Sequence, residues 1–320
     1  MAKKNKEFKI NGISIAPGEH KEVFLNRYEL PTNSVIEIPI HVFRSVNEGP
    51  TILLSAGMHG DETNGIEIIR KVITRKEISN LKCGSIIAIP VINIVSFLFG
   101  SRELPDGRDM NRCFPGSKKG SLGSRIAHDL MKQIVPLIDF GFDFHTGGAK
   151  INNHPQMRCV FEFSDNLKLA EIFSPPLIIN STYRDGTFRR EAAKKGKPIL
   201  VFEGGESLRF DYLSINEGFN GILRVLHHYG MIEADSPENP TVKIMKDHWV
   251  RADESGLFHT AVPNGSFVRQ GDMIGAIANP YGAIDQKLIA PADGYIVGIN
   301  NQPVVHQGDA LIHIGYEGVN

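Results

Sequence analysis

The chain has 320 residues, of which 41% are hydrophobic and 22% charged, with a formal net charge of −1. These are the proportions of a folded globular protein, and they exclude an intrinsically disordered chain. Nothing in the balanced charge suggests a polyanionic partner, so we expect no nucleic-acid partner. The most apolar window, 85–99, is shorter than a membrane span and contains Pro90 and Asn93, so we also expect no membrane association.

Strand-like and helix-like segments alternate through residue 230. The apolar runs of strand length are 36–43, 51–56, 85–92, 140–144, 158–163 and 198–202. Apolar residues at helical spacing predict helices over 63–76 and 121–135, and 217–229 has the character of a closing helix. This alternation predicts an α/β fold, in which helices flank both faces of a mostly parallel or mixed sheet.

The sequence changes character at the polar, proline-bearing stretch 233–240, which is typical of a linker. After it, Gly and Pro punctuate short apolar segments about every eight to twelve residues and no helix is evident, which is an all-β pattern. The segments 264–272 and 302–309 are similar and suggest a small barrel sandwich. We therefore predict two domains, 1–235 and 241–320.

A barrel sandwich of this kind could be a carrier domain, for which Lys287 is the only candidate attachment site. It lies four residues before Pro291, closer than in carrier domains, so we expect no lipoyl or biotinyl group. We expect the C-terminal domain instead to pack against the first domain, to narrow the mouth of its site, or to support a homo-oligomer.

The three cysteines, Cys83, Cys113 and Cys159, are widely spaced and odd in number. They form neither a disulfide framework nor a metal-binding CxxC pair. We expect reduced thiols and a cytoplasmic protein.

A histidine and a glutamate, His59 and Glu62, follow the apolar run 51–54 at a spacing suited to metal ligands. A second histidine, His145, follows the strand-like run 141–144. Two histidines and one glutamate around zinc leave a fourth position for water, as in catalytic zinc sites. Because open α/β sheets place their sites at the carboxyl ends of strands, we expect these side chains to meet there.

The loop 100–116 concentrates Arg102, Arg108, Arg112 and Asn111 among prolines and glycines. One interpretation is a solvated loop with a salt bridge to Asp109. The other is a carboxylate clamp, because guanidinium groups bind carboxylates through two parallel hydrogen bonds and can stabilise an oxyanion.

Four motifs in order resemble those of the succinylglutamate desuccinylase/aspartoacylase family, relatives of the zinc carboxypeptidases. They are HGDE at 59–62, DGRDMNRCFPG at 106–116, DFHTG at 143–147 and VFEGG at 201–205. Met110 stands where the family usually has leucine, a conservative difference. The resemblance implies a zinc-carboxypeptidase-like mixed sheet flanked by helices, followed by a small all-β barrel-sandwich domain.

The resemblance also implies roles for individual residues. His59, Glu62 and His145 would bind one zinc ion per chain. Glu203, at the end of the strand 199–202, would be the general base that moves a proton from water to the leaving nitrogen. Glu206 is an alternative base, less favoured by its position.

Arg102 would polarise the scissile carbonyl and hold the developing oxyanion, while Asn111 and Arg112 would bind the substrate's α-carboxylate. Asp61 and Asp143 could orient ligand histidines through their outer ring nitrogens, or be ordinary loop acids.

The predicted function is zinc-dependent amidohydrolysis, in which water activated by the metal deacylates a small N-acyl amino acid or related amide. Two alternatives remain: a metallocarboxypeptidase acting on peptide C-termini, and a non-catalytic metal-binding relative. The acyl group and the amino acid stay open. Arg184, Arg189 and Arg190 could add a second anionic contact, although solvation at the surface is the expectation for them.

Overall fold

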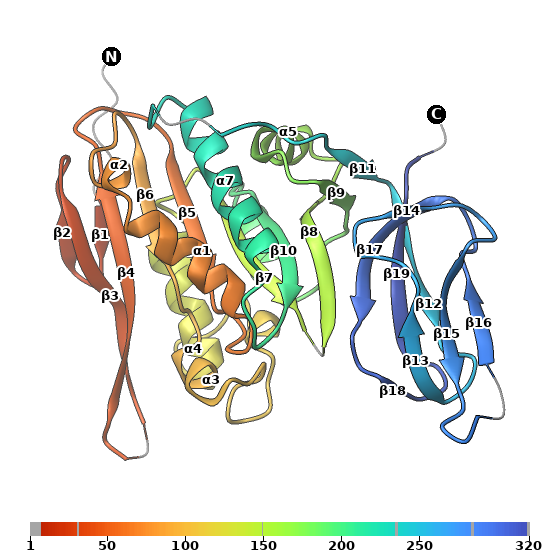
Figure 1. The fold of residues 1–320 in the computed structure, drawn as a ribbon. Coiled ribbons are helices and arrows are strands. Elements are labelled where there is room, and N and C mark those ends of the chain that lie inside the picture. Colours follow the sequence, from red (N-terminus) through yellow and green to blue (C-terminus); the bar gives the residue numbers. More distant parts are fainter. Residues whose placement is uncertain (1–7, 31, 149, 234–235, 283–284, 319–320) are drawn as a thin grey trace.

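A computed structural model describes residues 8–30, 32–148, 150–233, 236–282 and 285–318 (Figure 1). Its main feature is a mixed sheet in which the strands lie in the order β12-β19-β17-β8-β10-β7-β5-β6-β4-β3. Strands β6, β5, β7 and β10 run parallel to one another, and antiparallel strands flank them on both sides. The predicted α/β class is confirmed.

The strands of the first part are β1 (Phe8–Ile10), β2 (Ile13–Ile15), β3 (His20–Glu29), β4 (Val35–Arg44), β5 (Thr51–Ala56), β6 (Ser85–Ile89), β7 (Phe140–Gly147), β8 (Ile151–Cys159), β9 (Leu177–Asn180) and β10 (Ile199–Glu206). Its α-helices are α1 (Thr63–Ile73), α2 (Lys76–Ser79), α3 (Ile94–Phe99), α4 (Leu122–Asp129), α5 (Ser164–Phe173), α6 (Phe188–Ala193) and α7 (Tyr212–His228). A 3-10 turn spans Met110–Arg112, and a π-helical turn, Leu130–Ile134, continues α4.

Two hydrophobic clusters lie on opposite faces of the sheet. Helices α1, α5 and α7 contribute to one, and α4 and α6 to the other. Every residue of β5 and of β7 is buried, as expected of central strands that helices cover on both faces. This burial explains why β5 can be predicted from the sequence, where it is a continuous apolar run.

Four phenylalanines form the centre of the first cluster: Phe142, Phe144, Phe173 and Phe202. The ring of Phe173, on α5, lies 5.1 Å from that of Phe142 and 5.5 Å from that of Phe202, centroid to centroid. Such tilted aromatic contacts add to the free energy gained by burial. They fix α5 against β7 and β10.

The predicted strand 158–163 is wrong for most of its length, because β8 spans Ile151–Cys159 and α5 already begins at Ser164. Strand β8 is difficult to predict from the sequence because polar residues interrupt its apolar pattern, at Asn152, Asn153 and Gln156. Helix α7 begins at Tyr212, earlier than predicted, where Asp211 caps it by accepting a hydrogen bond from the Ser214 N–H at 2.8 Å.

Beyond residue 240 the described residues form strands and no helix, as predicted. The strands are β11 (Val242–Ile244), β12 (Lys246–Arg251), β13 (Gly256–Thr260), β14 (Phe267–Val268), β15 (Met273–Ala278), β16 (Asp285–Ile289), β17 (Gly294–Asn300), β18 (Val304–Val305) and β19 (Ala310–Tyr316). Strands β16, β15, β13 and β18 form a separate sheet, whereas β17 pairs with β8, so the main sheet runs through the predicted domain boundary.

None of the helices in the described part of the chain is both long enough and apolar enough to cross a membrane.

Replacing Phe173 with Ala should lower the free energy of unfolding by about 3–5 kcal/mol, because it leaves a cavity among packed rings. Phe163→Ala is the control, since that ring is 51% exposed, and it should change stability by less than about 1 kcal/mol. Urea unfolding followed by circular dichroism measures both. Equal losses in the two variants would contradict the assigned core.

Candidate active site

The loop from β5 to α1 carries His59 and Glu62, as predicted. Its path needs two glycines. Gly57 has a φ of +61°, and a Cβ on Gly60 would lie 1.9 Å from the carbonyl carbon of Ser96. Glu62 is the N-cap residue of α1. His145 was expected just after a strand but lies within β7, which continues to Gly147.

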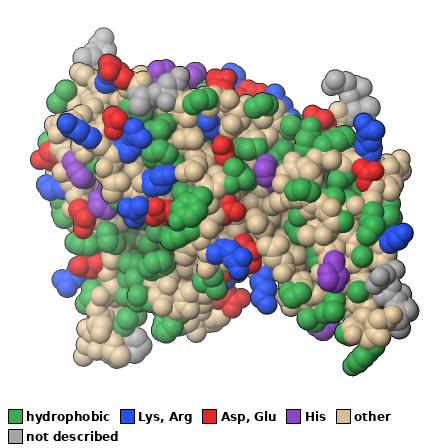
Figure 2. Space-filling model, in the orientation of Figure 1, with side chains coloured by type: hydrophobic (Ala, Val, Ile, Leu, Met, Phe, Trp, Pro, Cys, Tyr) green, Lys and Arg blue, Asp and Glu red, His purple; other side chains and the backbone are tan. Residues whose placement is uncertain are grey.

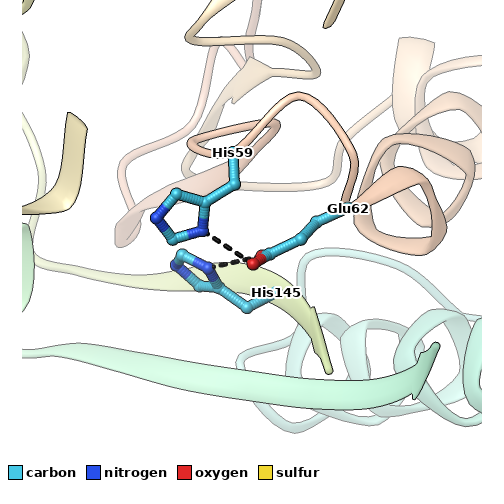
Figure 3. A group of neighbouring side chains, drawn as sticks. All are labelled: His59, Glu62 and His145. Atoms are coloured by element: carbon cyan, nitrogen blue, oxygen red, sulfur yellow. Dashed lines mark hydrogen bonds and ion pairs between the residues drawn. The ribbon is translucent and has the colours of Figure 1, made fainter. Parts of the chain in front are cut away.

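The three side chains converge on one point. His59 Nδ1 lies 2.7 Å from Glu62 Oε1, and His145 Nδ1 lies 2.8 Å from Glu62 Oε2. Figure 3 shows both imidazoles directed at the same carboxylate. All three residues are buried, and their ligand atoms lie within 4.8 Å of one another. Two imidazole nitrogens and a carboxylate oxygen form a donor set that suits zinc.

The outer nitrogens of both imidazoles are held by carboxylates. His59 Nε2 lies 2.9 Å from Asp109 Oδ1, and His145 Nε2 lies 2.8 Å from Asp143 Oδ2. Asp143 in turn accepts a hydrogen bond from Ser55 Oγ at 2.7 Å. Such partners fix ring orientation and direct the inner nitrogen to a metal.

The two aspartates that the sequence suggested as orienting partners differ in the structure. Asp143 contacts a ligand imidazole, whereas Asp61 contacts neither, and its Oδ1 is buried without a hydrogen-bond partner among the described residues. Asp109, which we considered only as a salt-bridge partner, orients His59. Asp61, two residues after His59, therefore does not orient a ligand imidazole. Asp109, 50 residues from His59 in sequence, does so because the fold places it beside the ring.

The electrostatics of this cluster are strongly coupled. Burial alone would lower the pKa of each imidazole, but Glu62 and Asp109 outweigh it at His59, and Asp143 and Glu62 outweigh it at His145, so both pKa values are raised. Burial alone would raise the pKa of Glu62, yet the two imidazoles bring it well below its usual range. The site therefore favours the ionised form of the buried Glu62 carboxylate.

The arginine loop lies against the same site. Arg102 donates to Glu62 Oε1 at 2.9 Å and to Asp109 Oδ2 at 3.0 Å. Asn111 Oδ1 accepts from the Phe188 N–H at 3.0 Å, which ties the loop to α6. Arg102, Asn111 and Arg112 all line one cavity with the metal donors. The structure thus brings the three predicted side chains to the predicted site.

Glu203 and Glu206 were expected beyond the end of a strand, but both lie inside β10, which extends to Glu206. Glu203 is opposite His145 in the parallel pair β10–β7 and faces the cavity. Its Oε2 accepts a hydrogen bond from Asn153 Nδ2 at 2.7 Å, and its Oε1 lies 3.6 Å from Arg158 Nε. Glu206 instead accepts from Asn301 at 2.7 Å and does not line the cavity.

The cavity has a volume of about 550 Å³ and includes residues from both parts of the chain. Asp247, Trp249 and His313, from β12 and β19, line it together with Glu203. The ring of Trp249 stacks on that of His313 at 4.5 Å. Figure 2 shows charged side chains of both signs near the indentation between the two parts of the molecule. These C-terminal residues could not be predicted from the sequence, because isolated side chains in a β pattern carry no motif.

Arg189 was expected at the surface, which is wrong: it is buried and lines the cavity. Its Nη2 donates to the Thr182 carbonyl at 2.6 Å, whereas its Nη1 is buried with no hydrogen-bond partner among the described residues. Burial, with Arg158 nearby, lowers the pKa of Arg189 to about 10, so the group stays charged at neutral pH. Arg184 is exposed and also lines the cavity, and Arg190 pairs with Asp185.

Known proteins are similar to this chain in sequence and in architecture. The model of the succinylglutamate desuccinylase/aspartoacylase catalytic domain matches residues 48–229. The N-alpha-acetyl-L-2,4-diaminobutyric acid deacetylase of Halomonas elongata is 30% identical over 293 residues, which cover 86% of this chain and 84% of that protein.

Among solved structures, a succinylglutamate desuccinylase/aspartoacylase from Rhodobacter sphaeroides has a TM-score of 0.83 at 28% identity, over 94% of this chain and 96% of that one. An ectoine utilization protein from Ruegeria pomeroyi, in a product-bound structure, has a TM-score of 0.83 at 22% identity, over 92% and 94% of the two chains, and shows a shared fold. The matched family model spans more than half of the chain and includes His59, Glu62 and His145, so this chain belongs to the succinylglutamate desuccinylase/aspartoacylase family.

Proposed function

We propose that the protein is a zinc-dependent amidohydrolase that deacylates a small N-acyl amino acid. The observation that carries the proposal is the lining of a single cavity. This cavity is lined by a set of donor atoms that suits zinc, by the carboxylate of Glu203 and by several arginines. Metal-assisted hydrolysis of a carboxylate-bearing amide needs this combination.

His59, Glu62 and His145 would hold one zinc ion per chain. Zinc bound there would supply a Lewis acid that polarises a carbonyl and lowers the pKa of water toward neutrality. Asp109 and Asp143 hold the two imidazoles in place through their outer nitrogens.

Glu203 is the proposed general base. It would accept a proton from the attacking water and give it to the leaving amine as the amide C–N bond breaks. The hydrogen bond from Asn153 fixes one carboxylate oxygen, and Arg158 lies beside the other. The second oxygen, held less tightly, is the one suited to proton transfer.

The arginine loop would bind the substrate at two places. Arg102, held by Glu62 and Asp109, would stabilise the negative charge that develops on the carbonyl oxygen. Asn111 and Arg112 would bind the α-carboxylate. Arg189, with its unpaired Nη1, is available for a second anionic group or a carbonyl oxygen.

The size of the cavity supports a small substrate over a peptide. Asp247, Trp249 and His313 of the C-terminal strands line the same cavity, where they would narrow the space for an extended polypeptide. A metallocarboxypeptidase is therefore the less favoured activity. The name of the Halomonas relative supports an acetylated amino acid as the first substrate to test. A panel of N-acetyl, N-succinyl and dipeptide substrates would separate these possibilities, and hydrolysis of dipeptides alone would refute the proposal.

Replacing Glu203 with Gln should lower kcat by about 10²–10⁴-fold while bound metal is retained, because only the proton carrier is lost. The matched control is Glu206→Gln, on the same strand but outside the cavity, which should keep most of the activity. Steady-state kinetics and metal analysis provide the readouts. The reverse ranking would assign the base to Glu206.

Replacing Arg112 with Ala should raise KM about 10–100-fold for substrates with an α-carboxylate, because a charge-assisted hydrogen bond is lost. Arg108→Ala is the control, since Arg108 belongs to the same loop but does not line the cavity. An equal rise in KM with the matching α-carboxamide would contradict the proposed contact.

Removing bound metal with a chelator should abolish activity, and adding zinc should restore it.

Asp143→Asn should weaken zinc binding about 10–100-fold, because it removes the acceptor that orients His145. Asp106→Asn, in a carboxylate that contacts neither imidazole, should leave zinc affinity unchanged. Competition with a chromophoric chelator measures both, and equal affinity in the two variants would refute the orienting role.

A further inference from the structure

Asn153, on β8, lies between the proposed base and the C-terminal strands. It pairs with Gly205 of β10 on one side and with Gly298 of β17 on the other. Figure 1 shows β17 beside β8, where the two parts of the chain meet. The side chain is buried, and its Nδ2 donates to Glu203 Oε2 at 2.7 Å. One residue of β8 therefore connects the base to a strand of the C-terminal part.

A row of paired residues crosses the sheet at this level. From β12 to β10 it consists of Trp249, His313, Gly298, Asn153 and Gly205. Residues that pair directly across strands lie on the same face of a sheet, and Trp249, His313 and Asn153 all line the cavity. Gly298 lies between two of these residues and adds no side chain of its own. The row is therefore open at β17, directly beside Asn153.

The amide group of Asn153 occupies this opening. A Cβ on Gly298 would lie 2.7 Å from Asn153 Oδ1, a separation at which one of the two groups must shift. Gly298 is not among the glycines with a positive φ, so its backbone conformation does not itself require glycine. What glycine provides at this position is space for the neighbouring amide.

The direction of that amide matters to the base. A carboxylate only accepts hydrogen bonds, so the NH₂ end of Asn153 must face Glu203 and the oxygen must point away from it. The oxygen is the end that lies over Gly298. Arg158 Nε lies 3.6 Å from the other oxygen of Glu203, too far for a good hydrogen bond. Asn153 therefore makes the closer of these two contacts to the carboxylate.

Strand β17 is anchored to the first part of the chain near this contact. Just beyond its end, the Asn301 N–H donates to the Lys150 carbonyl at 2.9 Å. The Asn301 side chain donates to Glu206 Oε2 at 2.7 Å. These hydrogen bonds reach the beginning of β8 and the end of β10. They fix the position of Gly298 relative to Asn153.

We propose that Asn153 and Gly298 are positioning residues for the base, through which the C-terminal part controls the rate of the reaction. Gly298 leaves the space that holds the amide in one direction, and Asn153 holds the Glu203 carboxylate in the cavity. This role rests on the proposed hydrolytic function. Neither residue needs to contact the substrate. Because a carboxylate that rotates freely is less often in position for proton transfer, kcat should depend on both residues, whereas KM should not.

Steady-state kinetics of the full-length protein, on the best N-acetyl or N-succinyl amino acid of the panel, test this role. Asn153→Ala should lower kcat about 10–100-fold, because a hydrogen bond to a charged group is lost. KM should change less than about threefold, and bound zinc should be unchanged. Gly298→Ala should lower kcat by a similar factor, because the added methyl group displaces the amide.

Gly315→Ala, on the neighbouring strand β19, is the matched control. A Cβ there would likewise lie 2.7 Å from a side-chain atom, Cγ2 of Ile244, but Gly315 does not line the cavity. This variant introduces similar crowding away from the base and should keep the kcat of the wild type. A loss of kcat equal to that of Gly298→Ala would show a general effect of crowding and would overturn the inference.

The double variant tests whether the glycine acts through the asparagine. Asn153→Ala with Gly298→Ala should have the same kcat as Asn153→Ala alone, since no amide remains to be displaced. Losses that multiply, or a wild-type kcat in Asn153→Ala, would overturn the inference. Circular dichroism of each variant shows that a loss of activity is not a consequence of unfolding.

Glu203→Gln in the same assay separates this role from the proposed function. If the wild type hydrolyses nothing, or if Glu203→Gln is fully active, the proposed function fails and the positioning role fails with it. If Glu203→Gln is inactive while Asn153→Ala and Gly298→Ala match the wild type, only the positioning role fails.

Discussion

A single buried carboxylate, that of Glu62, organises the site. It contacts both ligand imidazoles, accepts a hydrogen bond from Arg102, and lies 3.2 Å from the backbone N–H of Thr146. A buried charge is tolerated only when such partners replace water. The partners come from the β5–α1 loop, the arginine loop and β7. The hydrogen bonds to this one carboxylate therefore hold three segments of the chain together.

The parallel pairing of β7 and β10 connects this carboxylate to the chemistry. Because the register places Glu203 opposite His145, the strand that carries a proposed metal ligand also fixes the position of the proposed base. The ladder is irregular between Glu203 and Glu206, so the two glutamates, three residues apart, have different surroundings. One faces the cavity, and the other holds Asn301 of the C-terminal part. Backbone geometry thus separates two chemically identical side chains into different environments.

What the sequence could predict depended on the range of the interactions involved. The strand at 51–56 was predicted with its observed bounds, because burial on both faces leaves a continuous apolar run, and His59 and Glu62 stood out by their spacing. By contrast, most of β8 was missed because polar residues interrupt its apolar pattern; two of them, Asn153 and Arg158, line the cavity. His313 acquires its surroundings from β12, which is distant in sequence, and Arg189 lies near Arg158 of β8 as well as near its sequence neighbours Ser181 and Thr182. Such pairings leave no local pattern.

The pairing of β17 with β8 limits where the chain can be cut into separate fragments. One edge of β8 is shared: residues 156–159 pair with β9, and residues 151–153 pair with β17. Unpaired backbone at a strand edge is a template for association with other chains. The C-terminal strands therefore protect β8 from aberrant pairing. A fragment ending after α7 would keep every proposed metal donor and still present an open edge beside the cavity, which makes aggregation its characteristic failure.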